Sequence, residues 1–396
     1  MPKINPEIES FARIKVIGIG GSGKNALNHM INSKVRGVEF IAMNTDTQDL
    51  HNSLAEKKVH LGKNLTKGLG AGMNPEVGKR AAGETKAEIQ DVIKGADMIF
   101  IACGMGGGTG TGAAPIVAQA AKEQGILTVA VVTKPFSFEG NQRMKIADAG
   151  LAELEREVDA IIVIPNDRLI IISGKEVGFK QAFAMCDEVL KQAVEGISEL
   201  ITTPGMINVD FADIKSVMSD AGSALMGIGV AGGEGRAEKA ALAAINSPLL
   251  DLSISGAHGV LFAISGGEDL TIHEIQEAAK IITESIDKES KVIFGTISDE
   301  RLKKGEMKVT VIATGFPTDA PKRTLFQSQN KMSEKTVSES TKEEIAEAIK
   351  KETDKNSSTD YIKKNDKENN EKVEDELFID DTDDWSTVPA FLRRKK

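Results

Sequence analysis

The feature that most constrains this chain is a glycine-rich segment, Gly104-Met-Gly-Gly-Gly-Thr-Gly-Thr-Gly112, which follows an apolar strand pattern and precedes a helical one. Glycine loses more conformational freedom on folding than any other residue, so such a run is costly unless it contacts something. A glycine loop after a strand lets backbone N–H groups approach phosphate oxygens, and the next helix adds a partial positive charge. The segment therefore predicts a phosphate-binding site rather than a merely flexible connection.

A second glycine-rich segment, Gly18-Ile-Gly-Gly-Ser-Gly23-Lys24-Asn25, lies near the start of the chain. It fits the dinucleotide fingerprint G-x-G-x-x-G and also the beginning of a Walker A loop, G-x-x-x-x-G-K. A Walker A loop needs Ser or Thr after the Lys to hold Mg²⁺, and Asn25 offers no hydroxyl. In a dinucleotide site Asp46 could reach the ribose, but a site with one glycine turn leaves the other loop unexplained. On these residues alone, phosphate binding and a purely structural turn both stay open for this loop.

Strand and helix patterns alternate through the first part of the chain. Strands are expected at residues 13–19, 39–43, 97–103, 126–132 and 160–164, and helices at 25–33 and 114–124. This alternation predicts a parallel sheet covered by helices. Apolar residues then recur at helical spacing through Phe179–Thr202, which predicts one long helix ended by Pro204-Gly205. A second α/β domain is expected beyond it, with strands at residues 259–265, 291–296 and 307–314 and helices at 236–244 and 271–285.

The end of the chain has a different composition. All 38 glycines occur at or before Gly315, and charged and small polar residues dominate the segment 317–377. This segment holds too few apolar side chains to offset the entropy of ordering, so we expect a disordered linker there and a flexible N-terminus at 1–12. The net charge of −10 argues against non-specific nucleic-acid binding. No apolar run approaches the ~20 residues of a membrane span, and no signal peptide or cysteine pair is visible, so a cytoplasmic protein is expected.

Several segments beyond the glycine loops match one family in order and spacing. The sequence of residues 106–112, Gly-Gly-Gly-Thr-Gly-Thr-Gly, resembles the signature of the tubulin and FtsZ family. The other matching segments are residues 44–46, 68–78, 135–139, 165–167 and 208–213. The resemblance covers about residues 13–316 and resumes at the C-terminus; one departure is Lys24, where the family often carries a small or uncharged residue. It implies a tubulin-like fold with a GTP-binding domain at 13–178, a central helix at 179–202 and a C-terminal α/β domain with the catalytic loop at 203–316.

The resemblance also implies a GTPase that binds GTP and GDP at the two glycine loops. Asp187 would accept hydrogen bonds from the N1–H and 2-amino groups of guanine, assisted by Asn166. Glu139 and Arg143 would contact the ribose and nearby groups, although their spacing alone favours a surface ion pair. The implied nucleotide-binding residues are Gly21, Ser22, Gly23, Lys24, Asn25, Gly107, Gly108, Thr109, Gly110, Glu139, Arg143, Asn166 and Asp187.

Neither glycine loop carries a carboxylate that could position water at a γ-phosphate. Asp210 and Asp213 are the best candidates for polarising the water, but they follow the long helix, at its far end from the expected nucleotide. In the family the loop of one subunit enters the nucleotide site of the next, so the resemblance implies head-to-tail filaments and assembly-dependent hydrolysis. Mg²⁺ is expected to be held mainly through the nucleotide, with no protein metal site. The alternative reading is that Asp210 and Asp213 cap the next helix.

Apolar residues return at the end of the chain, in residues 378–396. Trp385, Val388, Phe391 and Leu392 would share one face of a short helix, with Pro389 in its first turn. This pattern is typical of a peptide that docks in a partner's groove, although it could also pack back on its own domain. The resemblance implies docking onto membrane-tethering division proteins, hence indirect membrane association and a ring at the mid-cell division site.

Two other functions compete with this one. An NAD-dependent Rossmann enzyme would explain the first glycine loop but not the second, nor the segment 208–213. A nucleotide-binding structural or adaptor protein that has lost hydrolysis would explain both loops, but the presence of Asp210 and Asp213 argues against it.

Overall fold

The computed structural model describes residues 12–173, 178–203, 205–247, 249–250, 254–299 and 301–316. These residues belong to one compact unit, Met1–Thr324. The expected linker at 317–377 and the expected C-terminal peptide, with Trp385, Val388, Pro389, Phe391 and Leu392, lie outside the described residues.

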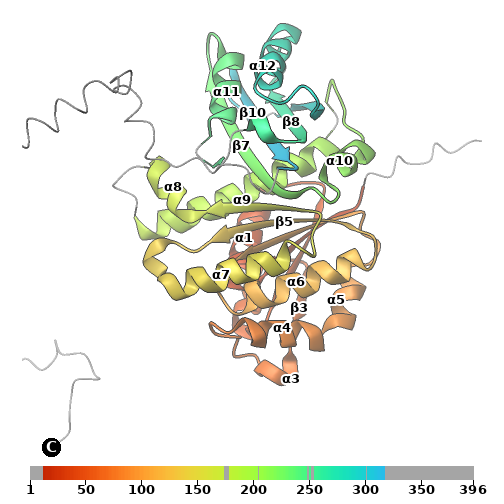
Figure 1. Cartoon of the computed structure of the whole chain (residues 1–396), viewed down its shortest axis with the longest axis vertical. Helices are drawn as coiled ribbons and strands as arrows, with labels where there is room; N and C mark the ends of the chain where they lie inside the picture. Colours follow the sequence, from red (N-terminus) through yellow and green to blue (C-terminus); the bar gives the residue numbers. More distant parts are fainter. Residues whose placement is uncertain are drawn as a thin grey trace, which may run out of the picture. The chain divides into compact units, whose positions relative to one another are not determined.

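The first half of the described chain is a parallel sheet covered by helices (Figure 1). Its strands are β1 (Ile14–Ile19), β2 (Val38–Asn44), β3 (Lys57–His60), β4 (Met98–Gly104), β5 (Leu127–Lys134) and β6 (Ala160–Pro165). Its helices are α1 (Gly20–Asn32), α2 (Thr47–His51), α3 (Lys63–Thr66), α4 (Pro75–Glu84), α5 (Lys86–Ile93), α6 (Thr109–Lys122), α7 (Asn141–Leu154) and α8 (Asn166–Ser173), with a short 3₁₀ helix, η1 (Ser137–Glu139). The strands lie in the order β3-β2-β1-β4-β5-β6, and all pairs are parallel.

The central strands are buried on both faces, which explains their continuous apolar sequences. Alternate residues of β1 enter different parts of the core: Val16 packs in the cluster that includes α1, and Ile17 in the cluster that includes α6. The five strands expected in this half are confirmed, with ends that differ by one or two residues.

Two helices begin earlier than the sequence predicted, and the predicted starts at residues 25 and 114 are wrong. The helix α1 begins at Gly20 and α6 begins at Thr109. Glycine has a low helix propensity, so the loops were expected to continue past these positions. Each helix therefore begins directly after its glycine-rich connection, with its first N–H groups at the end of the preceding strand.

The long helix predicted at residues 179–202 is confirmed as α9 (Phe179–Thr202). It lies across the middle of the molecule in Figure 1, with α1 and β5 on one side and the second half of the chain on the other. Its buried stripe includes Leu190, Val194 and Ile197, which share one core cluster with residues of both halves. The helix therefore connects the two halves through apolar packing as well as through the chain.

The second half contains two antiparallel strand pairs, one parallel pair and the helices around them. Its strands are β7 (Gly222–Gly232), β8 (Gly259–Gly266), β9 (Lys291–Ser298) and β10 (Glu306–Thr314). Its helices are α10 (Phe211–Met218), α11 (Arg236–Ile245) and α12 (Ile272–Glu284), with the 3₁₀ turn η2 (Ile254–Gly256). The expected strands at 259–265, 291–296 and 307–314 and the expected helices at 236–244 and 271–285 are confirmed within two residues.

The strand β7 was not predicted, because glycine weakens strand patterns. Its glycines allow α11 to lie close to the sheet. A Cβ atom at Gly229 would lie 2.0 Å from the carbonyl oxygen of Ala240, and one at Gly227 would lie 2.1 Å from that of Ala244.

The two halves share one sheet of ten strands, in the order β3-β2-β1-β4-β5-β6-β7-β10-β8-β9. The join is the short parallel pairing of β6 with β7, in which Ala160, Ile161 and Ile162 lie opposite Gly222, Ser223 and Ala224.

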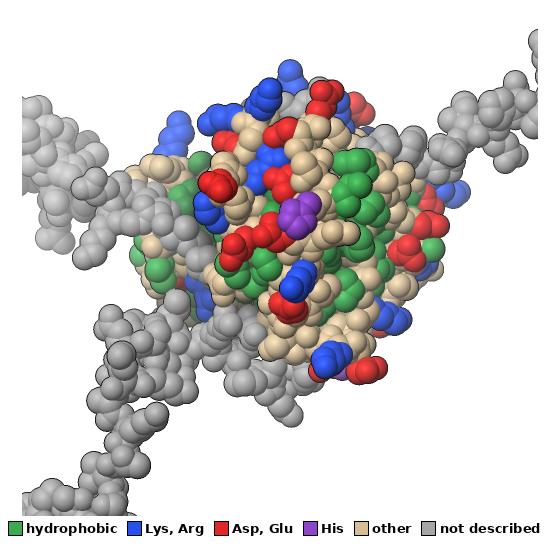
Figure 2. Space-filling model, turned by 90° about the horizontal axis from the view of Figure 1, so that it is seen from above, with side chains coloured by type: hydrophobic (Ala, Val, Ile, Leu, Met, Phe, Trp, Pro, Cys, Tyr) green, Lys and Arg blue, Asp and Glu red, His purple; other side chains and the backbone are tan. Residues whose placement is uncertain are grey.

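The face that carries α11 and α12 mixes acidic and basic side chains, and apolar side chains gather on one side of it (Figure 2). The described residues on this face form no continuous basic surface of the kind that binds nucleic acid. In the described part of the chain, no helix combines the length and the apolar character needed to cross a membrane.

Candidate functional site

A cavity of about 450 Å³ lies where the parallel strands end. Its lining includes residues that end or directly follow β1, β4, β5 and β6, such as Gly20, Gly104, Pro135 and Asn166. From β1 the chain continues to β2 on one side, whereas β4, β5 and β6 lie on the other side. Ligands of open α/β sheets bind at the carboxyl ends of the strands, where the strand order reverses. The two glycine loops follow β1 and β4, the pair of strands that flank this point.

Eleven of the thirteen nucleotide-binding residues expected from the sequence line this cavity: Gly21, Ser22, Asn25, Gly107, Gly108, Thr109, Gly110, Glu139, Arg143, Asn166 and Asp187. Gly23 and Lys24 are not among the lining residues. Gly23 instead packs α1 against the sheet, because a Cβ atom there would lie 2.4 Å from the carbonyl oxygen of Ala102.

Two helices begin at the cavity without a capping side chain. The N-cap residue of α1 is Ile19, whose side chain has no acceptor atom, and that of α6 is Gly108, which has no side chain. The first N–H groups of a helix have no partner within the helix, and with the helix dipole they form a site for anions. The lining of the cavity includes Gly21, Ser22, Thr109 and Gly110 from these first turns. This arrangement suits a polyphosphate.

Glycine is required at two points of these loops. Gly20 has φ of +72°, a conformation that side-chain-bearing residues rarely adopt. A Cβ atom at Gly108 would lie 2.4 Å from the carbonyl oxygen of Gly72, and the Gly108 N–H donates to that same oxygen at 2.9 Å. The second glycine loop is therefore tied to the segment between α3 and α4.

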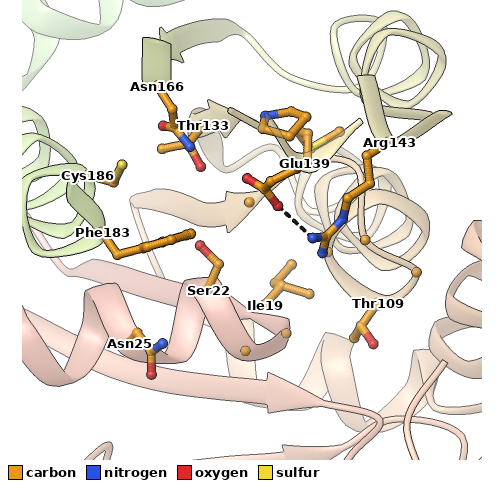
Figure 3. Close-up of a pocket in the computed structure, with 18 of the residues that line it drawn as sticks. Ile19, Ser22, Asn25, Thr109, Thr133, Glu139, Arg143, Asn166, Phe183 and Cys186 are labelled. Carbon is orange, nitrogen blue, oxygen red and sulfur yellow. Dashed lines mark hydrogen bonds and ion pairs between the residues drawn. The ribbon is translucent and has the colours of Figure 1, made fainter. Parts of the chain in front are cut away.

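Glu139 and Arg143 form the ion pair that their spacing suggests, and both also line the cavity. The Arg143 Nη1 donates to Glu139 Oε2 at 2.5 Å (Figure 3). Glu139 Oε1 accepts the Phe136 N–H at 2.9 Å. The Arg143 Nε is buried without a hydrogen-bond partner among the described residues. A buried donor without a partner is costly, so this atom fits a role in holding a ligand.

Asn166, the first residue of α8, is 5% exposed and also lines the cavity. Its Oδ1 atom is buried and has no hydrogen-bond partner within the described chain. Figure 3 shows Asn166 and Phe183 on the same side of the cavity, with Phe183 reaching in from α9. An amide acceptor beside an aromatic ring suits a planar heterocycle with polar edges.

Asp187 faces the cavity from α9, next to Cys186 and one turn after Phe183. Burial raises the pKa of Asp187 from 3.8 to about 6, while His29 and Lys24 act in the opposite direction. Burial and the neighbouring Asp187 raise the pKa of Cys186 to about 12, so its thiol is neutral near pH 7. A partly desolvated carboxylate that is ionised near pH 7 is a strong acceptor for paired N–H donors.

Lys24 is 9% exposed and lies beneath the first loop. Its Nζ donates to Asp49 Oδ1 at 2.6 Å. The sequence left open whether Lys24 contacts phosphate or solvent, and the structure shows a third arrangement, an ion pair inside the protein.

Asp210 and Asp213 lie away from the cavity, beyond the C-terminal end of α9. Asp210 is the N-cap of α10, and its Oδ1 accepts the Ala212 N–H at 3.1 Å. Asp213 lies in the first turn of α10, and both residues are exposed. From Asp187 to the end of α9 the helix runs for roughly 22 Å. The capping role is therefore present for Asp210, and neither carboxylate reaches the cavity of its own chain.

The lining also includes residues that were not among the nucleotide-binding residues assigned from the sequence: Ile19, Gly20, Gly72, Gly104, Met105, Thr133, Pro135, Phe183 and Cys186. Most follow from position, because they end a strand or flank a glycine loop. Phe183 and Cys186 were assigned only to the apolar stripe of the long helix. The fact that Asp187 directly follows Cys186 was the available sign that this stripe turns toward the site.

The described residues contain no group of three or more His, Cys, Asp or Glu side chains placed to hold a metal ion. Within the lining of the cavity, the carboxylates are Glu139 and Asp187.

Comparison with known proteins identifies two domains. Residues 13–174 match the family model described as Tubulin/FtsZ family, GTPase domain, and residues 222–317 match that of the FtsZ family, C-terminal domain.

Solved structures agree with these matches. An empty FtsZ dimer from M. jannaschii is 46% identical, with a TM-score of 0.75, over 78% of this chain and 89% of that one. A point variant of the same M. jannaschii protein is also 46% identical with a TM-score of 0.75, over 77% and 92% of the two chains. A GTPγS-bound CetZ2 protofilament structure from Haloferax volcanii is 22% identical with a TM-score of 0.66, over 86% and 99%, and shares the fold.

With the cavity at the two glycine loops, the sheet of ten strands and the long α9 between its halves, these matches show that the chain belongs to the FtsZ family of tubulin-like GTPases.

Proposed function

We propose that this GTPase forms head-to-tail filaments in which each nucleotide site is completed by Asp210 and Asp213 of the next subunit. The observation that carries the proposal is the separation of two parts that the reaction needs. The cavity has helix N-termini that suit phosphate, and its two lining carboxylates have other roles: Glu139 is paired with Arg143, and we assign Asp187 to the base. The two exposed carboxylates lie beyond the far end of α9.

The proposed roles within the cavity follow from its chemistry. The backbone N–H groups at the start of α1 and α6 hold the phosphates. Arg143 and Glu139 contact the ribose and nearby groups. Asp187 accepts hydrogen bonds from the guanine N1–H and 2-amino group, and Asn166 assists it. Adenine offers no equivalent pair of donors, so a carboxylate at this place selects guanine.

We propose that Mg²⁺ is held mainly by phosphate oxygens and water. The carboxylates in the lining, Glu139 and Asp187, are assigned to other contacts, whereas Mg²⁺ keeps several waters when phosphates supply its other ligands. The ion would neutralise charge that develops on the phosphates during hydrolysis.

Asp210 and Asp213 are proposed to polarise the attacking water. A head-to-tail contact does not close on itself and therefore generates filaments. The M. jannaschii FtsZ that is 46% identical to this chain has been solved as a dimer, which supports self-association in this family. Hydrolysis would then weaken the contact and allow turnover of subunits.

We further propose that the C-terminal peptide, residues 378–396, docks onto membrane-tethering division proteins and so places the filaments in a ring at mid-cell. The support is the sequence: apolar residues including Trp385, Phe391 and Leu392 follow a polar linker of about sixty residues. Membrane association would be indirect, through these partners.

The experiment measures GTP hydrolysis per subunit as a function of protein concentration. Wild-type protein should show a threshold followed by rising specific activity. The Asp213→Ala variant should bind GTP like the wild type yet hydrolyse it at least about 100-fold more slowly.

A mixing test then distinguishes a shared site from a self-contained one. Asp213→Ala subunits keep an intact nucleotide cavity but lack a carboxylate in the catalytic loop. Asp187→Asn subunits keep an intact catalytic loop, but their cavity no longer binds GTP tightly. Each variant should be nearly inactive alone, but an equal mixture should recover up to about a quarter of wild-type activity, because random head-to-tail contacts pair an intact cavity with an intact loop that often. Sedimentation of tagged Asp187→Asn protein verifies that it enters the filaments. Concentration-independent hydrolysis, or co-sedimenting variants with no recovered activity, would exclude the shared site.

A further inference from the structure

The pair formed by Lys24 and Asp49 has no role in the scheme above, yet it lies directly beneath the first glycine loop. The Lys24 Nζ donates to Asp49 Oδ1 at 2.6 Å, and the Lys24 and Asp49 side chains are 11% and 29% exposed. Lys24 belongs to the second turn of α1, and Asp49 to α2. The ion pair is partly withdrawn from water, and charges interact more strongly in such a place than in water.

Asp49 is held by contacts that lead toward the cavity. Its Oδ2 accepts from Asn44 Nδ2 at 2.7 Å, and the Asn44 Oδ1 accepts the Thr45 N–H at 2.8 Å. The hydroxyls of Thr45 and Thr109 lie 2.6 Å apart, and Thr109 lines the cavity. A chain of hydrogen bonds therefore connects the ion pair to the first residue of α6.

Asp49 is also close to the first glycine loop. Its Oδ2 lies 3.5 Å from the position that a Cβ atom would occupy at Gly21, a residue of the cavity lining. A carboxylate beside a phosphate-binding loop weakens nucleotide binding, because it repels the phosphates. A nucleoside triphosphate carries about four negative charges near pH 7, and like charges repel each other. The ammonium group of Lys24 cancels this opposition.

We infer that Lys24 is a positioning residue for nucleotide binding, which acts by neutralising the Asp49 carboxylate beneath the phosphate loop rather than by touching phosphate. This inference rests on the proposed function only in placing the phosphates against Gly21 and Thr109. It explains why a buried lysine follows the glycines of the first loop without lining the cavity. It also assigns to Asp49 the task of fixing Asn44, and through it the turn that carries Thr45.

The electrostatics at Asp187 agree with this role. Burial raises the pKa of Asp187, and Lys24 is one of the two groups that lower it. The positive charge of Lys24 therefore also acts on Asp187, although its hydrogen bond is made with Asp49.

The test compares four proteins in one binding assay: wild type, Lys24→Met, Asp49→Asn and the double variant. Fluorescent GDP and a fluorescent, non-hydrolysable GTP analogue are titrated at protein concentrations below assembly, at low and at high salt. Lys15→Met is the matched control. Lys15 is buried to a similar degree, with a side chain 9% exposed and paired with Glu39, but it lies at the opposite end of β1 from the cavity.

Lys24→Met should weaken binding of the GTP analogue about 10-fold and binding of GDP about 3-fold at low salt. Both losses of affinity should become smaller near 0.5 M salt because charges are screened. Asp49→Asn alone should leave affinity unchanged or tighten it about 2-fold, and in the double variant it should restore affinity to within about 2-fold of wild type. Lys15→Met should leave both affinities unchanged.

Three outcomes would overturn the inference. An equal loss for both nucleotides that persists in high salt would make Lys24 merely structural. A loss that Asp49→Asn does not repair would mean that Lys24 contacts phosphate directly. Unchanged affinity of Lys24→Met would remove any role in binding. Asp187→Asn is titrated in the same assay. If this variant binds GTP as tightly as wild type, the proposed site itself is wrong. If Asp187→Asn loses affinity for GTP while Lys24→Met keeps it, only the present inference is wrong.

Discussion

Replacing Asp187 by Asn should make the empty protein more stable while it abolishes tight GTP binding. Burial raises the pKa of Asp187 from 3.8 to about 6, so the folded protein binds this proton more readily than the unfolded chain. A raised carboxyl pKa means that stability falls as pH rises from the unfolded pKa through the folded one, and stays low above it. The full shift corresponds to about 3 kcal/mol. Because Asp187 is partly exposed, we expect Asn to recover about 1–2 kcal/mol near pH 8.

The same substitution acts in the opposite direction on binding. The carboxylate offers two acceptors to the guanine N1–H and 2-amino group, whereas Asn offers one acceptor and a donor that opposes them. Each hydrogen bond to a charged group contributes about 1.5–3 kcal/mol, so GTP affinity should fall at least about 100-fold. Below about pH 6 the wild type should lose affinity as well, because Asp187 then takes up a proton.

The assay is thermal unfolding of nucleotide-free protein near pH 8 and near pH 5, followed by titration with GTP. Near pH 8 the Asp187→Asn protein should melt about 2–6 °C above wild type, and near pH 5, which lies between the unfolded and folded pKa values of Asp187, only about half of this difference should remain. The neighbouring Glu188→Gln is the control of opposite sign. Burial raises the pKa of Glu188, but hydrogen bonds with His29, Lys191 and Gln192 lower it by more, so the net pKa is decreased. The folded protein therefore favours the charged form of Glu188, and the neutral Gln should destabilise it. Wild-type GTP affinity in Asp187→Asn, or a melting temperature below wild type near pH 8, would refute the reasoning.

Two further substitutions test the scaffold around the site. Arg236→Met should destabilise the protein by about 3 kcal/mol, because it leaves Asp269 and Glu274 without their shared partner. Arg236 lowers the pKa of Glu274 from 4.5 to about 2, so the stability that the pair contributes is lost as pH falls from 4.5 toward 2, and urea unfolding should show wild type and variant converging over that range. Gly20→Ala should cost about 1–2 kcal/mol because of the positive φ at this position, whereas the control Gly83→Ala, in an open and exposed position of α4, should stabilise the protein by about 0.5–1 kcal/mol. Equal melting temperatures for the two glycine variants would show that the backbone of the first loop is not constrained.

Much of the fold was predictable because the local sequence pattern of each element agrees with its burial in the tertiary structure. The buried parallel strands are apolar throughout, and α9 repeats its apolar residues over 24 positions, which leaves little ambiguity in period. The glycine loops were predictable for a similar reason, since their composition is costly without a ligand.

The predictions that failed concern features that depend on packing between elements distant in sequence. The strand β7 carries glycines because α11 packs closely on it, and no local signal records that approach. The starts of α1 and α6 were placed too late, because their glycines are poor helix formers that the loops need nonetheless.

The candidate site shows the same division. Strand ends and motifs indicated eleven lining residues, but the place of Lys24 depends on Asp49, which lies 25 positions further along the chain. A lone lysine after a glycine loop predicts phosphate contact unless its partner is known. The direction of Phe183 likewise depends on how α9 lies against the first half of the sheet, which no periodicity fixes.

The join between β6 and β7 spans only three residue pairs, so hydrogen bonds contribute little to holding the two halves of the sheet together. A single apolar cluster bridges them instead, with Val16 and Leu27 from the first half, Ile197 from α9 and Ile312 from the second half. Hydrophobic contact is non-directional, so it tolerates small rotations that a long strand ladder would resist. The apolar cluster therefore resists separation of the two halves more strongly than it resists a small rotation between them. Each subunit can twist slightly about this join, which would make the filament we propose compliant in torsion.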